Sequence, residues 1–172
     1  MAIQPPSNQD SEQLLERDRP RVSGRRVICV VDDDQSVLKS VARLLESEGF
    51  TVRTFAHPDQ ALKYMEANSV PLAILDIWMQ EMTGMELLAH LCARSPQTHA
   101  IFITGHEDEA AEATVMQAGA FAFFIKPFDD VKFLAAVHCA LGDPLPGKPG
   151  LVQRARAFLK TDRRLSKGGP RS

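Results

Sequence analysis

The sequence predicts an α/β fold in which a doubly wound parallel sheet carries helices on both of its faces. Five short apolar runs alternate along the chain with five longer segments whose apolar residues recur at helical spacing. One of these runs, residues 72–75, is apolar without interruption and is bounded by turn residues. Such a run is typical of a strand that is buried on both faces, and strands of this kind occur mainly in parallel sheets.

The strands are expected at the five short apolar runs. The run at 51–55 alternates polar and apolar residues and is rich in β-branched side chains, which favours an edge strand. The run that starts at 72 follows Pro71 and ends in an aspartate. The predicted strands are 27–31, 51–55, 72–76, 100–103 and 121–125.

The helices are expected between these strands, where start and stop signals frame the periodic segments. Pro58 suits the first turn of the second helix, and Gly49 and Gly119 suit the ends of the first and the fourth. The fourth helix is rich in alanine and poor in large apolar residues, so we expect it to be the least firmly packed. The predicted helices are 36–48, 58–68, 85–93, 108–118 and 129–141, and the last is expected to bury Val131, Leu134, Val137 and Leu141.

Charge and composition divide the chain into a globular body and two polar ends. Residues 27–142 contain 7 basic and 16 acidic residues, a net charge of −9, whereas residues 143–172 contain 8 basic and 2 acidic residues, a net charge of +6. We therefore expect a flexible N-terminal extension at 1–25 and one domain at 26–142. A Pro/Gly linker and a basic tail are expected at 143–172.

Several classes of protein are not favoured. No apolar run is long enough to span a bilayer, and the polar N-terminus lacks the apolar segment of a secretory signal. A cytoplasmic protein without a membrane partner is therefore expected. The three cysteines, Cys29, Cys92 and Cys139, lack metal-ligand or redox spacing and are expected to be small buried hydrophobic residues.

Polar residues stand at the ends of four predicted strands. In chain order they are Asp32 and Asp33, Asp76, Thr104, and Lys126. Because the carboxyl ends of parallel strands meet at one edge of the sheet, we expect a single pocket with Asp76 at its centre. Three carboxylates repel one another unless a cation lies among them, and Mg²⁺ suits such oxygen ligands, with Mn²⁺ as the alternative.

These residue types fit the chemistry of an aspartyl phosphate. The carboxylate of Asp76 can act as the nucleophile, while a metal ion and Lys126 neutralise charge on the phosphoryl oxygens. The hydroxyl of Thr104 can donate a hydrogen bond to the same group. Taken singly, Thr104 could also be an ordinary helix N-cap ahead of Glu107.

Taken in this order, the motifs resemble the response-regulator receiver domain, the phosphoacceptor module of bacterial two-component signalling. The resemblance rests on VVDDD at 30–34, LDIWM at 75–79 with Gly84, ITG at 103–105, and AGA at 118–120 followed by KPF at 126–128. It covers residues 26–142 and implies a (βα)5 flavodoxin-like, or CheY-like, fold with strand order 2-1-3-4-5.

The resemblance also implies a role for each residue at this edge. It makes Asp76 the phosphoacceptor and makes Thr104 and Lys126 the residues that bind the phosphoryl group. The implied metal ligands are Asp32, Asp33, Asp76 and the backbone carbonyl of Trp78. Phosphorylation would draw Thr104 inward, Phe123 would rotate into the space that it leaves, and the face of the fourth helix, fifth strand and fifth helix would change. The Lys126–Pro127 peptide bond is expected to be cis.

Two positions depart from the family pattern. Gln80 stands where the family usually has proline, so the loop after Asp76 is expected to be less rigid. Trp78 is large for its position at the mouth of the pocket. We expect it to shield an acyl phosphate from water and to change its lifetime.

The resemblance implies a signalling protein and not an enzyme, with Mg²⁺-dependent self-phosphorylation and slow autodephosphorylation as its only chemistry. The implied donor is a sensor histidine kinase or a histidine phosphotransfer protein, and the implied output is contact with an unidentified target protein or a phosphorylation-dependent homodimer. A three-helix DNA reader cannot be built from residues 151–172, so a single-domain regulator or phosphorelay intermediate is expected and nucleic acid is not.

Two alternatives stay open at this level. A transcriptional regulator could use the basic tail, with Arg154, Arg156, Lys160, Arg163 and Arg164, to contact nucleic acid. A phosphatase of the haloacid dehalogenase type would use Asp32 as nucleophile and Asp34 as acid and base. That second alternative leaves Asp76 without a role.

Overall fold

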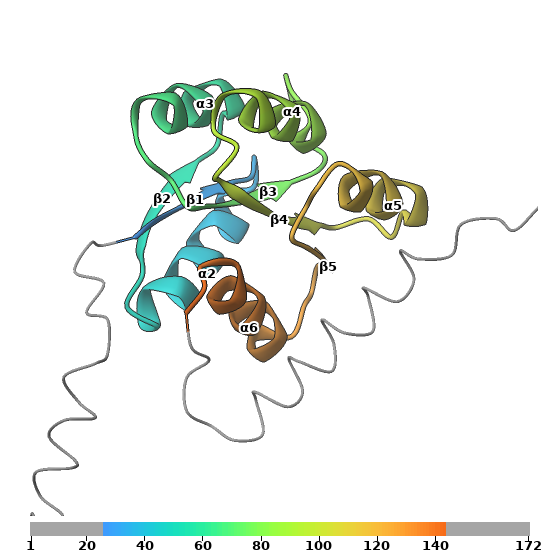
Figure 1. Cartoon of the computed structure of the whole chain (residues 1–172). Coiled ribbons are helices and arrows are strands. Elements are labelled where there is room, and N and C mark those ends of the chain that lie inside the picture. Colours follow the sequence, from blue (N-terminus) through green and yellow to red (C-terminus); the bar gives the residue numbers. More distant parts are fainter. Residues whose placement is uncertain (1–25, 144–172) are drawn as a thin grey trace, which may run out of the picture.

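Five strands form one parallel sheet in the order β2-β1-β3-β4-β5 (Figure 1). They are β1 (Val27–Val31), β2 (Thr51–Phe55), β3 (Leu72–Asp76), β4 (His99–Thr104) and β5 (Ala122–Ile125). The structure is a computed structural model that describes residues 26–143, so the predicted N-terminal extension and nearly all of the predicted linker and basic tail lie outside the described residues. The sheet confirms the predicted fold class and strand order.

Five helices connect the strands and cover both faces of the sheet. They are α2 (Gln35–Ser47), α3 (Pro58–Ala67), α4 (Gly84–Arg94), α5 (Glu109–Gln117) and α6 (Asp130–Ala140). Helices α3, α4 and α5 pack on one face, and α2 and α6 pack on the other (Figure 1). The predicted alternation of strand and helix is therefore present throughout residues 26–143.

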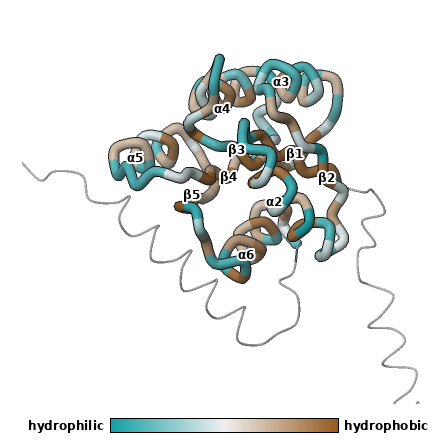
Figure 2. The backbone as a smooth tube through the Cα atoms, turned by 180° about the vertical axis from the view of Figure 1, so that it is seen from behind, coloured by the Kyte–Doolittle hydropathy of each residue, from teal (hydrophilic) through white to brown (hydrophobic). Residues whose placement is uncertain are grey.

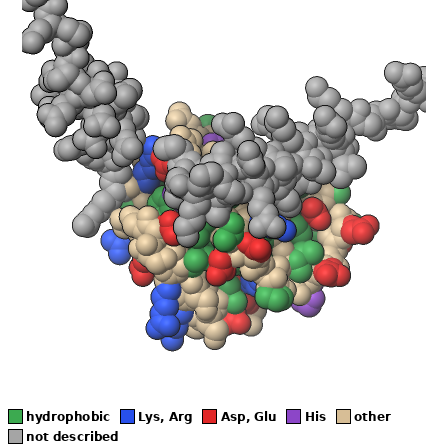
Figure 3. Space-filling view, turned by 90° about the horizontal axis from the view of Figure 1, so that it is seen from below, with side chains coloured by type: hydrophobic (Ala, Val, Ile, Leu, Met, Phe, Trp, Pro, Cys, Tyr) green, Lys and Arg blue, Asp and Glu red, His purple; other side chains and the backbone are tan. Residues whose placement is uncertain are grey.

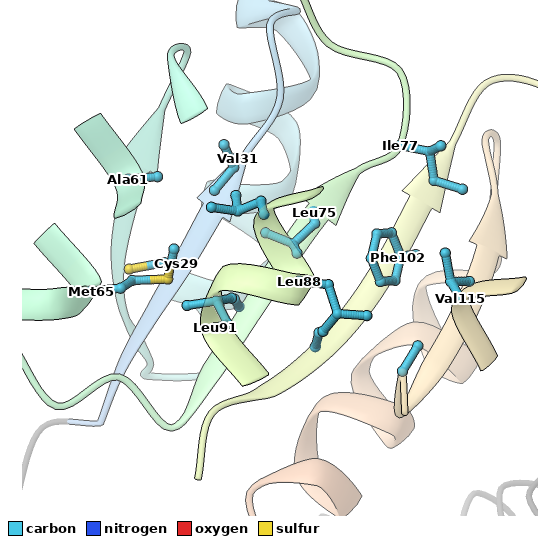
Figure 4. Packing of buried hydrophobic residues seen from close by; sticks show 14 of the residues in the cluster. Cys29, Val31, Ala61, Met65, Leu75, Ile77, Leu88, Leu91, Phe102 and Val115 are labelled. Carbon is cyan, nitrogen blue, oxygen red and sulfur yellow. The ribbon is translucent and has the colours of Figure 1, made fainter. Parts of the chain in front are cut away.

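Each face of the sheet has its own hydrophobic core because successive strand residues point to opposite faces. Cys29 and Val31 of β1 pack toward α3, α4 and α5, whereas Ile28 and Val30 pack toward α2 and α6. In Figure 2 the strands are mostly brown, while the helices alternate between brown and teal. Figure 4 shows the larger core from close by, with Leu75 of β3, Leu91 of α4 and Val115 of α5 among its members.

The central and edge strands differ in burial as their sequences predict. All five residues of β3 are buried, because the strand has neighbours on both sides and helices on both faces. None of the residues of β2 is fully buried, which fits its alternating sequence and its place at the edge of the sheet. Asp76 is therefore the last residue of the most buried strand of the domain.

Side-chain caps fix where the helices begin. The carboxylate of Asp34 accepts a hydrogen bond from the amide of Ser36 at the start of α2, so Asp34 is the N-cap of this helix. Asp108 and Asp129 cap α5 and α6 in the same way. Thr83 and Glu86 form a reciprocal capping box at the start of α4, which fixes the end of the loop that follows Asp76.

The prediction for the buried face of α6 is only partly right, because Val137 is the one residue of the four that is fully buried. Val131 is 44% exposed, and Leu134 and Leu141 are only half-buried. Besides Val137, the helix buries Phe133, Ala135, Ala136 and Ala140, which were not predicted. Small alanine side chains let the helix lie close to the sheet, and the ring of Phe133 fills the remaining space, so this face needs few branched aliphatic residues.

The prediction of three buried cysteines is also only partly right. Cys29 is buried in the core, whereas Cys92 is exposed on α4 and Cys139 is half-buried on α6. Burial raises the pKa of the Cys29 thiol to about 12, against a smaller lowering by Arg53. Cys29 therefore stays protonated and packs as a small hydrophobic residue.

The face of the domain that Figure 3 shows carries side chains of different kinds. Figure 3 shows acidic and hydrophobic side chains scattered among one another on the face seen from below. Among residues 26–143, no helix has both the length and the apolar character needed to cross a membrane.

Candidate functional site

The ends of four strands bring the predicted site residues to one edge of the sheet. Asp32 directly follows β1, Asp76 is the last residue of β3, Thr104 is the last residue of β4, and Lys126 directly follows β5. The three central strands are neighbours, and their parallel register places Asp76 opposite Ile103, one residue before Thr104. This convergence is the one that the sequence predicts.

Lys126 joins two of the carboxylates. Its Nζ lies 2.5 Å from Oδ2 of Asp32 and 2.9 Å from Oδ1 of Asp76. The Lys126 amide donates to the carbonyl of Thr104 at 2.7 Å, which fixes the base of the lysine side chain against β4. The side chains of Asp32 and Asp76 are only 1% and 7% exposed, so these ion pairs lie in a largely desolvated pocket.

Asp32 is held firmly on both sides of its carboxylate. Oδ1 accepts a hydrogen bond from the amide of Asp34 at 2.9 Å, while Oδ2 faces Lys126. The amide of Asp32 itself donates to the carbonyl of Phe55 at 3.2 Å. Asp32 is therefore a structural anchor of the pocket as well as a candidate metal ligand.

Asp33 differs from the other two aspartates because it is exposed. Its Oδ2 accepts a hydrogen bond from the backbone amide of Gln80 at 3.3 Å. Asp32, Asp33 and Asp76 each offer one carboxylate oxygen, and these oxygens lie within 4.8 Å of one another. Three converging carboxylates are the ligand type that a hard divalent cation prefers, so the residues present could hold a metal ion.

The pocket shifts the pKa values of two charged residues at its centre, Asp76 and Lys126. Burial raises the pKa of Asp76, and the nearby charge of Asp32 adds to this, while Lys126 and the amide of Trp78 act in the opposite direction. Burial would lower the pKa of Lys126, but its hydrogen bonds and ion pairs with Asp32 and Asp76 outweigh this and raise the pKa. The lysine is therefore a permanent cation beside Asp76 at neutral pH.

The loop from β3 to α4 folds back over Asp76. The amide of Gly84 donates to the carbonyl of Ile77 at 3.0 Å, and a Cβ at Gly84 would lie 2.1 Å from the carbonyl oxygen of Asp76. Within the loop, the amide of Met82 donates to the carbonyl of Gln80, and Glu81 has a φ of 72°. Only glycine at 84 allows the helix start to lie so close to the backbone of Asp76.

The remaining predicted residues surround this pocket. Thr104 is 1% exposed, and its hydroxyl accepts a hydrogen bond from the amide of His106. Thr104 does not cap α5, because Asp108 is the cap. Phe123 is half-buried and packs against the core beneath α3, α4 and α5, and Trp78 is 45% exposed. The Lys126–Pro127 peptide bond is cis, the isomer that the resemblance implies.

Sequence reasoning missed the contribution of Gln80. Its role comes from a backbone amide, which every residue except proline carries, so the type of side chain does not predict it. The only signal was the departure from proline at this position, which was interpreted as a loss of rigidity.

Comparison with known protein families identifies the family of this chain. The family profile of the response regulator receiver domain matches residues 28–138. The chain belongs to this family. Receiver domains are signalling modules that are phosphorylated on an aspartate and bind Mg²⁺ at an acidic pocket, and they take the phosphoryl group from histidine kinases or other phosphodonors.

Two relatives show how much of a longer protein this chain resembles. The response regulator protein TodT of Pseudomonas putida is 35% identical over 115 residues, which are 67% of this chain and 51% of TodT. The transcriptional regulatory protein FixJ of Azorhizobium caulinodans is 39% identical over 117 residues, which are 66% of this chain and 54% of FixJ. This receiver chain spans about half the length of these relatives.

Two solved structures share the fold. The beryllofluoride-activated NtrC4 receiver domain dimer superposes with a TM-score of 0.66 at 30% identity, covering 68% of this chain and 97% of that one. A response regulator protein from Burkholderia pseudomallei with a phosphorylated aspartic acid, a calcium ion and citrate superposes with a TM-score of 0.61 at 27% identity. That comparison covers 77% of this chain and 74% of the other.

Proposed function

We propose that this receiver domain accepts a phosphoryl group on Asp76. The observation that carries the proposal is the pair of contacts from Lys126 to Asp76 and Asp32 in a pocket that also contains Asp33. A carboxylate with a fixed ammonium group beside it and two further acidic groups at ligand distance suits a phosphoryl acceptor. The Burkholderia pseudomallei relative with a phosphorylated aspartic acid supports the same chemistry.

In the transfer step, Asp76, Lys126 and Thr104 each act on the phosphoryl group of the donor. An oxygen of Asp76 forms a bond to phosphorus while the bond from phosphorus to the donor's histidine nitrogen breaks, and the imidazole leaves with the electron pair. Lys126 then neutralises charge on the phosphoryl oxygens, and Thr104 donates its hydroxyl hydrogen to one of them. Burial raises the pKa of Asp76, and the contact with Lys126 opposes this by favouring the charged form that acts as the nucleophile.

We propose Mg²⁺ as the metal, with Mn²⁺ as a substitute. Its ligands would be Asp32, Asp33, Asp76 and the backbone carbonyl of Trp78. When bound, the ion supplies positive charge for the phosphoryl oxygens. Two observations support this assignment. The three carboxylates cluster, and among the described residues Lys126 is the one lysine that pairs with any of them, at Asp32 and Asp76.

We also propose that phosphorylation changes the face formed by α5, β5 and α6. The phosphoryl group would draw Thr104 inward, and Phe123 would rotate into the space that it leaves. Phe123 is half-buried and stands next to Phe102 in the strand register, so its ring lies between core and surface. A homodimer after phosphorylation is one output of this face, and the NtrC4 dimer supports that option.

The protein partners are proposed by the same argument. A sensor histidine kinase or a histidine phosphotransfer protein would supply the phosphoryl group in the cytoplasm, and a target protein would read the changed face. We propose that the receiver domain acts through contact with a target protein or as a phosphorelay intermediate. FixJ is named a transcriptional regulatory protein, so transcriptional control through the basic tail is the second candidate. The phosphatase alternative is not favoured, because Asp32 has both carboxylate oxygens engaged.

Phosphorylation by a small acyl phosphate tests the proposal. Wild type with Mg²⁺ and acetyl phosphate should gain the mass of one phosphoryl group by intact mass spectrometry, and Asp76→Asn should gain none. Asp59→Asn, at an exposed aspartate in the first turn of α3, is the matched control and should behave as wild type. A phosphoryl group that remains in Asp76→Asn and maps to Asp32 would support the phosphatase alternative instead.

A further inference from the structure

One hydrogen bond in the pocket comes from a residue to which the family resemblance assigns no part. The backbone amide of Gln80, in the loop between β3 and α4, donates to Oδ2 of Asp33 at 3.3 Å. The two residues are 47 positions apart, so the bond links the loop after β1 to the loop after β3. It therefore adds a direct link between these two loops at the proposed metal position.

The three aspartates differ in how their carboxylates are fixed. Asp32 and Asp76 are buried, and Lys126 contacts both. Asp33 is exposed, and within the described part of the chain the amide of Gln80 is the one donor that contacts its carboxylate. An exposed aspartate without such a contact samples several side-chain rotamers, and fixing one of them on metal binding costs conformational entropy.

The donor is itself held in place by the loop. The carbonyl of Gln80 accepts from Met82 at 2.8 Å, and Gly84 ties the loop end back to Ile77 at 3.0 Å. The capping box of Thr83 and Glu86 then joins the loop to the first turn of α4. The Gln80 amide is therefore a positioned donor and not a freely moving one.

We propose that the Gln80 amide is a positioning group for the metal site, which holds the Asp33 carboxylate toward Asp32 and Asp76. The bond engages one oxygen of Asp33 and leaves the other for a cation, so donor and metal do not compete for the same atom. A pre-oriented ligand binds more tightly because less freedom is lost on binding. This inference rests on the proposed Mg²⁺ site and adds the residue that tunes its affinity.

Two substitutions at position 80 separate the amide from the side chain. Gln80→Ala keeps the N–H group, and Gln80→Pro removes it, because proline alone lacks a backbone donor. Mg²⁺ alone is the ligand, and its binding is followed by the fluorescence of Trp78, the single tryptophan of the chain, which lies two residues after Asp76. Asp33→Ala sets the limit for a site without this ligand.

Gln80→Ala should bind Mg²⁺ as wild type does, whereas Gln80→Pro should bind about three- to tenfold more weakly, as expected for the loss of one hydrogen bond to a carboxylate. Equal affinities in the two variants would overturn the assignment. If wild type itself gives no saturable Mg²⁺ response, the metal site proposed above fails, and the role of Gln80 fails with it.

A second measurement avoids the proline, whose ring could alter the loop. The amide resonance of Gln80 is followed by nuclear magnetic resonance in the metal-free protein, in wild type and in Asp33→Ala. Loss of the carboxylate acceptor should move this amide proton upfield, while the amide proton of Gly84, which donates to Ile77, should stay in place. An unchanged Gln80 resonance would overturn the assignment whatever the outcome of the Mg²⁺ titration.

Discussion

Gly84 shows how the absence of a Cβ shapes the loop that follows Asp76. A Cβ at this position would lie 2.1 Å from the carbonyl oxygen of Asp76 and 3.0 Å from the ring of Phe102, and neither neighbour can yield easily. The first contact is with backbone, and the second is with a fully buried ring. Any side chain at 84 must therefore push the start of α4 away from β3.

We expect Gly84→Ala to lower the free energy of unfolding by about 3 kcal/mol, because overpacking against rigid neighbours is costly. Urea denaturation followed by circular dichroism measures this change. Gly105→Ala is the control, since Gly105 is exposed and a Cβ there would meet no atom within 4 Å. Equal loss of stability in the two variants would show that the close approach to Asp76 is not the cause.

Trp78 is one of two large hydrophobic residues that are strongly exposed within residues 26–143, and it lies in the loop after Asp76. On the proposed function, its ring limits the access of water to the acyl phosphate. Trp78→Asn should shorten the half-life of phosphorylated protein several-fold, as measured by the decay of the phosphorylated mass after the donor is removed. Val131→Asn changes the other exposed residue, on α6, and should leave the half-life unaltered.

At the scale of elements, α5 stands apart from the other helices of the domain. It buries only Ala111 and Val115, whereas α4 buries four residues, three of them leucines. Its start is secured by Asp108, which accepts from the amides of Ala110 and Ala111. The helix is thus well capped but weakly anchored to the sheet, which suits an element of the face that is proposed to change.

We expect the backbone amides of α5 to exchange with solvent faster than those of α4, because local opening of α5 exposes less apolar surface. Hydrogen–deuterium exchange of the unphosphorylated protein, resolved by peptide, gives this comparison within one sample. Helix α2 serves as an internal reference, since it buries Leu38, Val41 and Leu45. Protection of α5 equal to that of α2 and α4 would contradict the expected difference.

The elements also show which sequence patterns predict structure well. The continuous apolar run of β3 and the alternating run of β2 predict the central and edge strands, because period and burial agree there. The buried face of α6 was predicted only in part. The large aliphatic residues Val131 and Leu134 were expected to be buried, but Phe133 and Ala136 are buried in their place. Alanine carries no strong hydrophobic signal, yet it is the residue that permits a helix to lie close to a sheet.

At the scale of the whole molecule, the convergence of the strand ends was predictable, but the links between the loops were not. Parallel topology alone brings Asp32, Asp76 and Lys126 together, because each follows or ends a strand of the same sheet. The bond between Gln80 and Asp33 depends on a loop in which Glu81 has a positive φ. No local residue preference predicts that conformation for glutamate, so this part of the site required coordinates.

Both ends of the described domain meet around one histidine. His138 of α6 is nearly buried, and neither of its ring nitrogens has a hydrogen-bond partner. Its ring lies 5.1 Å from that of Phe50, its Nε2 lies 4.0 Å from Glu48 beyond the end of α2, and its carbonyl accepts from Asp143. Arg26, before β1, pairs with Asp143 at 2.8 Å, so the two ends of the described range lie close to this region.

Burial lowers the pKa of His138, and the charges of Asp143 and Glu48 oppose this only in part. The unfolded chain therefore takes up the proton first as the pH falls. The stability associated with the neutral imidazole is present above the ordinary histidine pKa of about 6.5 and is lost as the pH falls below it. Acidification should thus weaken the packing of α6 against α2 before most carboxylates titrate.

We expect wild type to lose more free energy of unfolding between about pH 7.5 and about pH 5.5 than His138→Phe, in which this titration is absent and the contact with Phe50 can persist. Urea denaturation at the two pH values gives the four free energies required. His90→Gln, at an exposed position on α4, is the control and should retain the wild-type pH dependence. If His138→Phe and wild type lose equal stability, the carboxylates cause the pH dependence. The titration of His138 then makes no contribution to the change in the free energy of unfolding.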